Sequence, residues 1–167
     1  MHSIRLVLGL MVGVVTSKTF KYTLPSSVEA TADCTLPGEF EISDFKVYTD
    51  FVDNTKNTTS FHYSDVDTGV DTSCQQNSTS KSTNTGAAQR WPCDDANVEF
   101  IYQTTTTGVS GLTLIEKACL ESSTSLEASG LVKPDLICTN TTSSSTCTGK
   151  QSPLPGDFTS ISPAPPQ

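Results

Sequence analysis

The sequence predicts an all-β protein, a compact, disulfide-stapled antiparallel β-sandwich or barrel. Three observations lead to this expectation. Short stretches in which apolar and polar residues alternate recur along the chain, and turn residues separate them. No stretch repeats apolar residues at helical spacing over three turns, so we expect little helix. Six cysteines are an even number, which in an exported chain indicates three disulfide bonds.

The strands are expected where the alternation is clearest. The first covers residues 40–47, and its alternation slips at residues 43–44, which indicates a bulge or bend. Residues 59–63 and 70–74 alternate on either side of a turn closed by Gly69, and together they predict a hairpin. Further strands are expected at residues 98–102, 112–115, 126–132 and 136–138.

Composition divides the chain into four segments. Residues 6–15 are an unbroken apolar run, too short for a membrane span of about 20 residues, and small residues follow it. This order predicts a secretory signal peptide over residues 1–17. Residues 18–33 are polar and predict a loosely held N-terminal arm, followed by the β domain over residues 34–150. Residues 151–167 hold five of the nine prolines and predict an extended, disordered tail.

The charge balance limits the classes of partner. Cleavage after Ser17 removes only Arg5, so nine basic residues face eighteen acidic ones, a net charge of −9. The basic residues are few and form no cluster, which argues against nucleic acid or an anionic membrane as the partner. We therefore expect a single secreted, extracellular domain.

Three N-glycosylation sequons indicate the same compartment. They begin at Asn57, Asn77 and Asn140, and each lies in a stretch rich in Ser, Thr and Asn. Such stretches are typical of exposed loops, so all three asparagines are predicted to carry glycans.

One acidic stretch and the six cysteines are the candidate metal ligands of the chain. Residues 65–71 place carboxylates at alternate positions, as in a calcium loop. An EF-hand loop begun at Asp65 would need glycine and glutamate where the chain has Val70 and Gln76, so a hairpin turn is the better interpretation. There is no Cys-x-x-Cys pair, and His62 is the only histidine left after cleavage. We therefore expect no metal and no other cofactor.

The candidate catalytic groups also favour a structural interpretation. His62 could act as a base beside Asp65, but no Gly-x-Ser-x-Gly elbow supports a nucleophile. The alternation places His62 in solvent, on the face opposite Phe61. Asp94 and Asp95 are adjacent, so on a strand they would point to opposite faces rather than flank one sugar bond. The sequence therefore predicts a protein that is not an enzyme.

Several short motifs occur in the order and at the spacing of a known family. They are Ile42-Ser43-Asp44-Phe45, Phe61-His62-Tyr63, Thr72-Ser73-Cys74, Trp91-Pro92-Cys93, Val98-Glu99-Phe100 and Leu112-Thr113-Leu114, and a closing Cys138 and Cys147 pair. Over about residues 34–150 the chain resembles the secreted fungal proteins typified by the major allergen of Alternaria, a family that includes elicitors of plant cell death. The resemblance implies an extracellular β-sandwich or barrel without catalytic machinery.

The resemblance also guides the expected disulfide pairing. Cys74–Cys93 and Cys138–Cys147 would each close a short loop between neighbouring strands. Trp91, beside the first bond, would either cap that bond in the core or anchor a protein interface. The allergen type uses its first cysteine to link two chains and has no cysteine like Cys119. Here Cys119 offers Cys34 an internal partner, so we expect a Cys34–Cys119 bond and a monomer or weak dimer.

For function, the resemblance implies a secreted fungal apoplastic effector or elicitor that binds a host extracellular protein and modulates plant defence. Loops are expected to carry recognition, at residues 69–90, 104–111 and 140–149. The alternative is a carrier of a small aromatic ligand, and a third class is structural attachment to the fungal wall through the Ser/Thr-rich ends. The carrier would hold its ligand in a pocket among Phe61, Tyr63, Phe100 and Tyr102.

Overall fold

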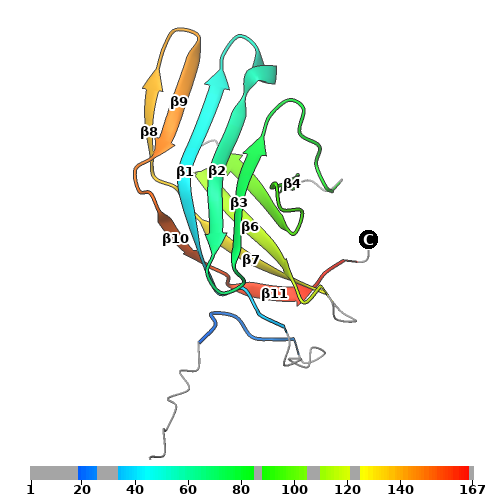
Figure 1. Cartoon of the computed structure of the whole chain (residues 1–167). Coiled ribbons are helices and arrows are strands. Elements are labelled where there is room, and N and C mark those ends of the chain that lie inside the picture. The colour runs from blue at the N-terminus through cyan, green and yellow to red at the C-terminus, as the bar shows by residue number, and fades with distance from the viewer. Residues whose placement is uncertain (1–18, 26–33, 85–87, 105–109, 121–124, 166–167) are drawn as a thin grey trace, which may run out of the picture.

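Two antiparallel β-sheets packed face to face make up the fold (Figure 1). The structure, a computed structural model, describes residues 19–25, 34–84, 88–104, 110–120 and 125–165. The predicted signal peptide and part of the predicted arm lie outside these ranges. Over the described residues the sheets remain separate and are not closed into one barrel. This confirms the predicted all-β class and identifies the sandwich as the architecture.

The first sheet has six strands, in the order β3-β2-β1-β9-β8, with β10 paired to β1 beside β9. The strands are β1 (Glu39–Asp50), β2 (Thr58–Asp65), β3 (Val70–Gln76), β8 (Leu136–Asn140), β9 (Ser144–Gly149) and β10 (Leu154–Asp157), and a short 3-10 turn, η1 (Asn54–Lys56), lies between β1 and β2. The register of β1 on β2 shifts between Ser43 and Lys46, where Asp44 has a φ of 55°. The predicted bulge and the predicted β2–β3 hairpin are both confirmed.

The second sheet has five strands, in the order β11-β7-β6-β5-β4. They are β4 (Trp91–Pro92), β5 (Val98–Thr104), β6 (Ser110–Ala118), β7 (Leu126–Val132) and β11 (Ser160–Pro163). An isolated bridge between Cys74 and Cys93 connects the edge of the first sheet to β4. The strands predicted from alternation are therefore present, and they divide into two layers.

The core lies between the layers and is rich in aromatic rings. The rings of Phe61 and Phe100, from opposite sheets, are 4.9 Å apart in an edge-to-face arrangement. Phe40 packs against Phe158 at the same centroid distance of 4.9 Å. Trp91 is half-buried and packs against this core, as expected for a residue beside the Cys74–Cys93 bond.

All six cysteines are paired as predicted. Cys74–Cys93 joins β3 to the end of β4, and Cys138–Cys147 joins β8 to β9. The Cys34–Cys119 bond ties the segment before β1 to the end of β6 across 85 positions of the chain. Because both partners of Cys34–Cys119 lie in one chain, neither sulfur serves a covalent dimer.

The prediction of a disordered C-terminal tail is wrong. Strand β10 pairs with β1 and strand β11 pairs with β7, while Phe158 between them is fully buried. Pro163 ends β11, which lies at the edge of its sheet, where a missing N–H interrupts no further ladder. Two prolines of this segment, Pro155 in β10 and Pro163 in β11, therefore lie in strands of the domain.

The described part of the predicted arm, residues 19–25, is fastened to the domain rather than loose. The Tyr22 hydroxyl donates to the Pro37 carbonyl at 2.6 Å, and Lys21 pairs with Asp157 of β10 at 2.7 Å. Tyr22 and Leu24 also pack against the core. Within the described ranges, no helix has the length and apolar character needed to span a membrane.

Candidate functional site

Three connections meet at one end of the sandwich, towards the top of Figure 1, and we call them the loop end. It consists of the β1–β2 connection (residues 51–57), the segment after β3 (residues 77–80) and the β8–β9 turn (residues 141–143). The Phe51 N–H donates to the Ser143 carbonyl at 2.8 Å, which joins the first connection to the third. A cavity of about 340 Å³ at this end has walls from both β1–β2 and the segment after β3.

Polar side chains hold the β1–β2 connection in one shape. The Asp50 carboxylate accepts the N–H groups of Val52 and Asp53, each at 2.9 Å. The Asn57 side-chain carbonyl accepts the Asp50 N–H at 2.8 Å, closing the connection from its other side. These backbone hydrogen bonds lower the pKa of Asp50, so its carboxylate stays ionised as the cap of the turn.

The same frame points two apolar side chains into solvent. Phe51 is 57% exposed and Val52 is 84% exposed. Asp53 lies next to them, and its pKa is lowered by hydrogen bonds from the Thr55 hydroxyl and N–H. Phe51 and Val52 belong to no strand predicted from alternation, and two adjacent apolar residues do not by themselves indicate an exposed loop. Phe51 and Val52 are adjacent exposed apolar side chains on a loop ordered by hydrogen bonds, which makes them a candidate contact surface for a protein partner.

The predicted recognition loops are shorter than expected. Residues 70–76 of the first are strand β3, and residues 105–109 of the second lie outside the described residues. The prediction of a loop over residues 140–149 is wrong, because β8 and β9 form a hairpin there with a turn at 141–143. The Thr141 hydroxyl fastens this turn by accepting the Ser144 N–H at 3.0 Å.

The three sequon asparagines lie at or beside the loop end. Asn57 and Asn77 are half-buried, and their side-chain carbonyls organise the backbone, Asn77 by accepting the Thr79 N–H at 2.9 Å. Asn140 is exposed at the end of β8. Glycosylation at these positions stays a prediction.

The four aromatic residues predicted to hold a ligand do not form a pocket. Phe61, Tyr63 and Phe100 are buried, and the close ring contacts fill the space between them with side chains. Tyr102 packs against Phe45, with ring centroids 5.4 Å apart, and it lines the cavity at the loop end. The prediction failed because aromatic residues at alternate strand positions mark the interior face, and here that face is the core.

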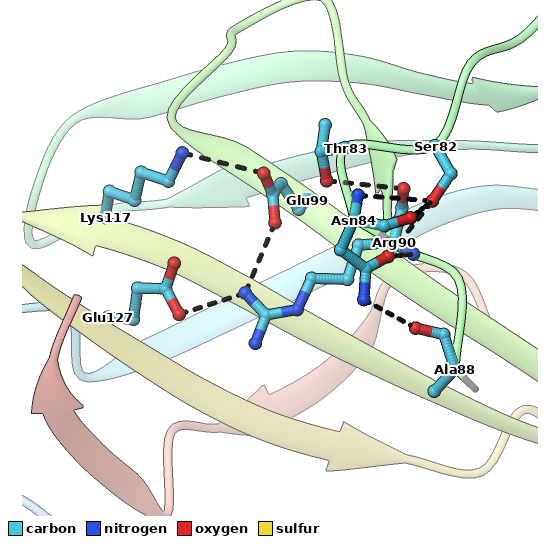
Figure 2. Close-up of polar contacts among 8 residues, drawn as sticks. All are labelled: Ser82, Thr83, Asn84, Ala88, Arg90, Glu99, Lys117 and Glu127. Carbon is cyan, nitrogen blue, oxygen red and sulfur yellow. Dashed lines mark hydrogen bonds and ion pairs between the residues drawn. The ribbon is translucent and has the colours of Figure 1, made fainter. Parts of the chain in front are cut away.

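A second polar feature, the Arg90 groove, lies on the outer face of the second sheet (Figure 2). Glu99 on β5 and Glu127 on β7 are buried, and they alternate with core residues, so their side chains point away from the core. Arg90 Nη1 lies 3.0 Å from Glu127 Oε2 and 3.5 Å from Glu99 Oε2. Lys117 Nζ on β6 lies 3.5 Å from Glu99 Oε1. Since β6 lies between β5 and β7, Arg90 bridges across it.

The segment before Arg90 is locked into the wall of this groove. The Arg90 N–H donates to the Asn84 side-chain carbonyl at 2.8 Å, and the Thr83 N–H donates to the Arg90 carbonyl at 2.9 Å. The Asn84 side-chain amide donates to the Ala88 carbonyl at 3.0 Å, as Figure 2 shows. The described part of the long polar stretch after β3 is therefore an ordered structure.

A polar cluster inside the sandwich joins the two sheets. The Tyr63 hydroxyl of β2 donates to the Glu116 carboxylate of β6, and Glu116 is 1% exposed. Burial raises the pKa of Glu116 to about 7, although the Tyr63 hydrogen bond acts in the opposite direction. Burial also raises the pKa of Asp65, whose Oδ1 accepts the Asp67 N–H in the β2–β3 turn.

The candidate catalytic groups occupy structural positions. His62 lies 3.1 Å from Asp71 on the outer face of the first sheet, and it does not pair with Asp65. Asp95 accepts the Asn97 N–H at 2.8 Å in the β4–β5 turn, as expected for a turn residue. Within the described ranges, no three His, Cys, Asp or Glu side chains are grouped so as to hold a metal ion.

Comparison with solved structures identifies a similar fold. The crystal structure of the Alternaria alternata allergen Alt a 1 matches with a TM-score of 0.51 and 15% identity, covering 76% of this chain and 89% of that chain. A second crystal structure of the same allergen matches with a TM-score of 0.49 and 16% identity, covering 77% of this chain and 96% of that chain. No family model and no curated protein matches the chain. The first match confirms an Alt a 1-like fold.

Proposed function

We propose that this chain is a secreted fungal effector or elicitor that binds a host extracellular protein through its loop end and modulates plant defence. The observation that carries the proposal is the rigid presentation of Phe51 and Val52 on a connection fixed by Asp50 and Asn57. Three disulfide bonds suit an oxidising compartment, and the fold is that of a fungal allergen.

The chemistry of the loop end indicates the kind of partner surface. Two exposed apolar side chains next to the carboxylates of Asp50 and Asp53 suit an apolar pocket with a basic rim. Burying one such side chain contributes about 1.5–3 kcal/mol. Because hydrogen bonds already order the connection, little further entropy is lost on binding. The acidic balance of the chain adds long-range attraction to a basic partner.

Affinity capture from plant apoplastic fluid tests the proposal, with variants that differ in one exposed valine. Val52→Ser changes the loop end, and Val66→Ser changes the β2–β3 turn at the opposite end of the sandwich, where Val66 is 88% exposed. We expect a host protein that binds wild type and Val66→Ser equally, and that binds Val52→Ser about tenfold more weakly. Equal binding by both variants would contradict the assignment of the loop end.

One observation favours a second candidate function, the carriage of a small aromatic ligand. Tyr102, Tyr48 and Val47 contribute to the wall of the loop-end cavity, which is otherwise polar, and its volume of about 340 Å³ is within the range of ligand pockets. A carrier would bind an apolar dye that flavonoid-type compounds displace, and Tyr102→Ala would abolish this binding while Val52→Ser would retain it. Dye binding that is unchanged in Tyr102→Ala would count against a carrier.

A further inference from the structure

We infer that the Arg90 groove binds a neutral oligosaccharide. The groove has a volume of about 940 Å³ and lies over β5, β6 and β7, on the outer face of the second sheet. None of the residues of the loop end lines it, so the two surfaces are separate. The inference therefore concerns another ligand and another site than the proposed protein partner.

The charged side chains that line the groove favour neither an anionic nor a cationic ligand. Among the described residues that line it, two cations, Arg90 and Lys117, face two carboxylates, Glu99 and Glu127, at distances of 3.0–3.5 Å. The buried carboxylates repel a polyanion, and the paired cations repel a polycation. Hydroxyl groups both donate and accept hydrogen bonds, so a polyhydroxylated neutral ligand can use both kinds of lining group.

The shape and the apolar borders fit a chain of pyranose rings. Pro92, Leu120 and Pro165 supply aliphatic surface around the charged floor, and Leu120 is 51% exposed. A pyranose ring has apolar C–H faces and a rim of hydroxyls, which match such a border and such a floor. The volume is large enough for several sugar units, because pockets for drug-sized ligands are roughly 300–1,000 Å³.

The backbone of the floor argues against an extended peptide. β6 is paired on both sides, by β5 and β7, so its N–H and C=O groups are used within the sheet. A peptide that adds to a sheet needs an unpaired edge strand, and the groove offers the face of a paired one. The groove is therefore better suited to a ligand whose hydroxyl groups are bound by side chains than to a peptide that pairs with the backbone.

The groove is organised before any ligand binds. Arg90 is held at its backbone by Asn84 and Thr83 and at its guanidinium by Glu99 and Glu127 (Figure 2). Side chains that are already fixed lose little rotamer freedom on binding. The described lining residues offer proline and leucine and include no aromatic platform, so we expect weak binding of short oligosaccharides.

Titration of the ¹⁵N-labelled protein with tetrasaccharides tests the inference by NMR. Cellotetraose and chitotetraose represent neutral glucan and chitin chains, while tetragalacturonate and tetralysine are the charged competitors. We expect at least one neutral tetrasaccharide to shift the amide signals of Arg90, Lys117 and Glu127. Comparison of the two neutral probes then identifies the sugar type.

Two leucine variants provide the matched control. Leu120→Ala removes apolar surface from the groove, and Leu131→Ala removes a similarly exposed leucine (56%) from β7 outside it. We expect Leu120→Ala to weaken the neutral tetrasaccharide at least fivefold and Leu131→Ala to leave its affinity within twofold. Tighter binding of a charged probe in the groove, equal effects of the two substitutions, or no shift with either neutral probe would overturn the inference.

Discussion

Replacing Glu116 with glutamine should change how the stability of the domain depends on pH. Burial between the sheets raises the pKa of Glu116 from its ordinary value of 4.5 to about 7. The folded state therefore holds the proton more tightly than the unfolded state does. The stabilisation linked to this group is fully present below about pH 4.5 and is lost as the pH rises through about 7.

The magnitude follows from the difference between the two pKa values. One pKa unit corresponds to about 1.4 kcal/mol, so a rise from 4.5 to about 7 corresponds to about 3 kcal/mol. Glutamine cannot ionise, and its side-chain carbonyl can still accept the Tyr63 hydroxyl. At pH 8 the free energy of unfolding of Glu116→Gln should exceed that of wild type by up to about 3 kcal/mol, and at pH 4 the two should nearly agree.

Urea unfolding between pH 4 and pH 8, with the disulfide bonds intact, measures this difference. Asp65, whose pKa is also raised by burial, contributes a slope of the same sign to both proteins. Glu41→Gln removes an exposed carboxylate from β1 and should follow wild type within about 0.5 kcal/mol. If Glu116→Gln and wild type lose the same stability between pH 4 and pH 8, the account of Glu116 is refuted.

Three further predictions concern stability and are measured by denaturant unfolding. Replacing Cys34 and Cys119 with serine should lower the free energy of unfolding by about 4.5 kcal/mol, and replacing Cys138 and Cys147 should lower it by about 2.5 kcal/mol. The difference arises because the first bond closes a loop of 85 positions and the second a loop of 9. Equal losses would argue against loop entropy as the cause. Deleting residues 151–167 should prevent cooperative folding, since it removes β10, β11 and a buried phenylalanine; unchanged cooperative folding would contradict the assignment of the tail to the core. Gly130→Ala should destabilise by about 1–3 kcal/mol or more, because its Cβ would lie 2.3 Å from the Asp157 carbonyl oxygen; a neutral effect would show that β10 moves aside freely.

Alternation and the cysteine pattern carried most of what the sequence could predict about the fold. Inward-facing residues such as Phe61 and Tyr63 are buried, and the slip at Ser43 is a true bulge. The disulfide pairing was expected from a family resemblance, and the structure confirms it. These features are local or pairwise, so a single sequence can reveal them.

Two expectations about the fold are wrong: the loop over residues 140–149, where β8 and β9 contribute no buried residue, and the disordered tail over residues 151–167, where composition is misleading. The apolar residues at 136–138 predict only the first part of β8, and β9 is not marked by apolar alternation because its residues are mostly polar and none is buried. The C-terminal strands are rich in proline, which indicates disorder in isolation but is tolerated in edge strands such as β11.

The candidate surfaces depend on tertiary structure, and the sequence offered little sign of them. Arg90 is separated from Glu127 by 37 positions, and only the order of β5, β6 and β7 brings them together. Phe51 and Val52 lie beyond the strand predicted at residues 40–47, and the hydrogen bonds of Asp50 that order the connection around them are visible only in the structure. A cluster of polar residues around an apolar pair was the one signal in the chain that could have found the loop end.

Hydrogen exchange of the protein bound to a host protein captured from apoplastic fluid tests the central claim most directly. The Val52 and Asp53 N–H groups already donate to Asp50, so their exchange reports on the β1–β2 connection itself. The proposal predicts slower exchange on binding at residues 51–57 and 141–143, with the β2–β3 turn around Val66 unchanged. Protection that is confined to the β2–β3 turn or to the outer face of the second sheet would contradict it.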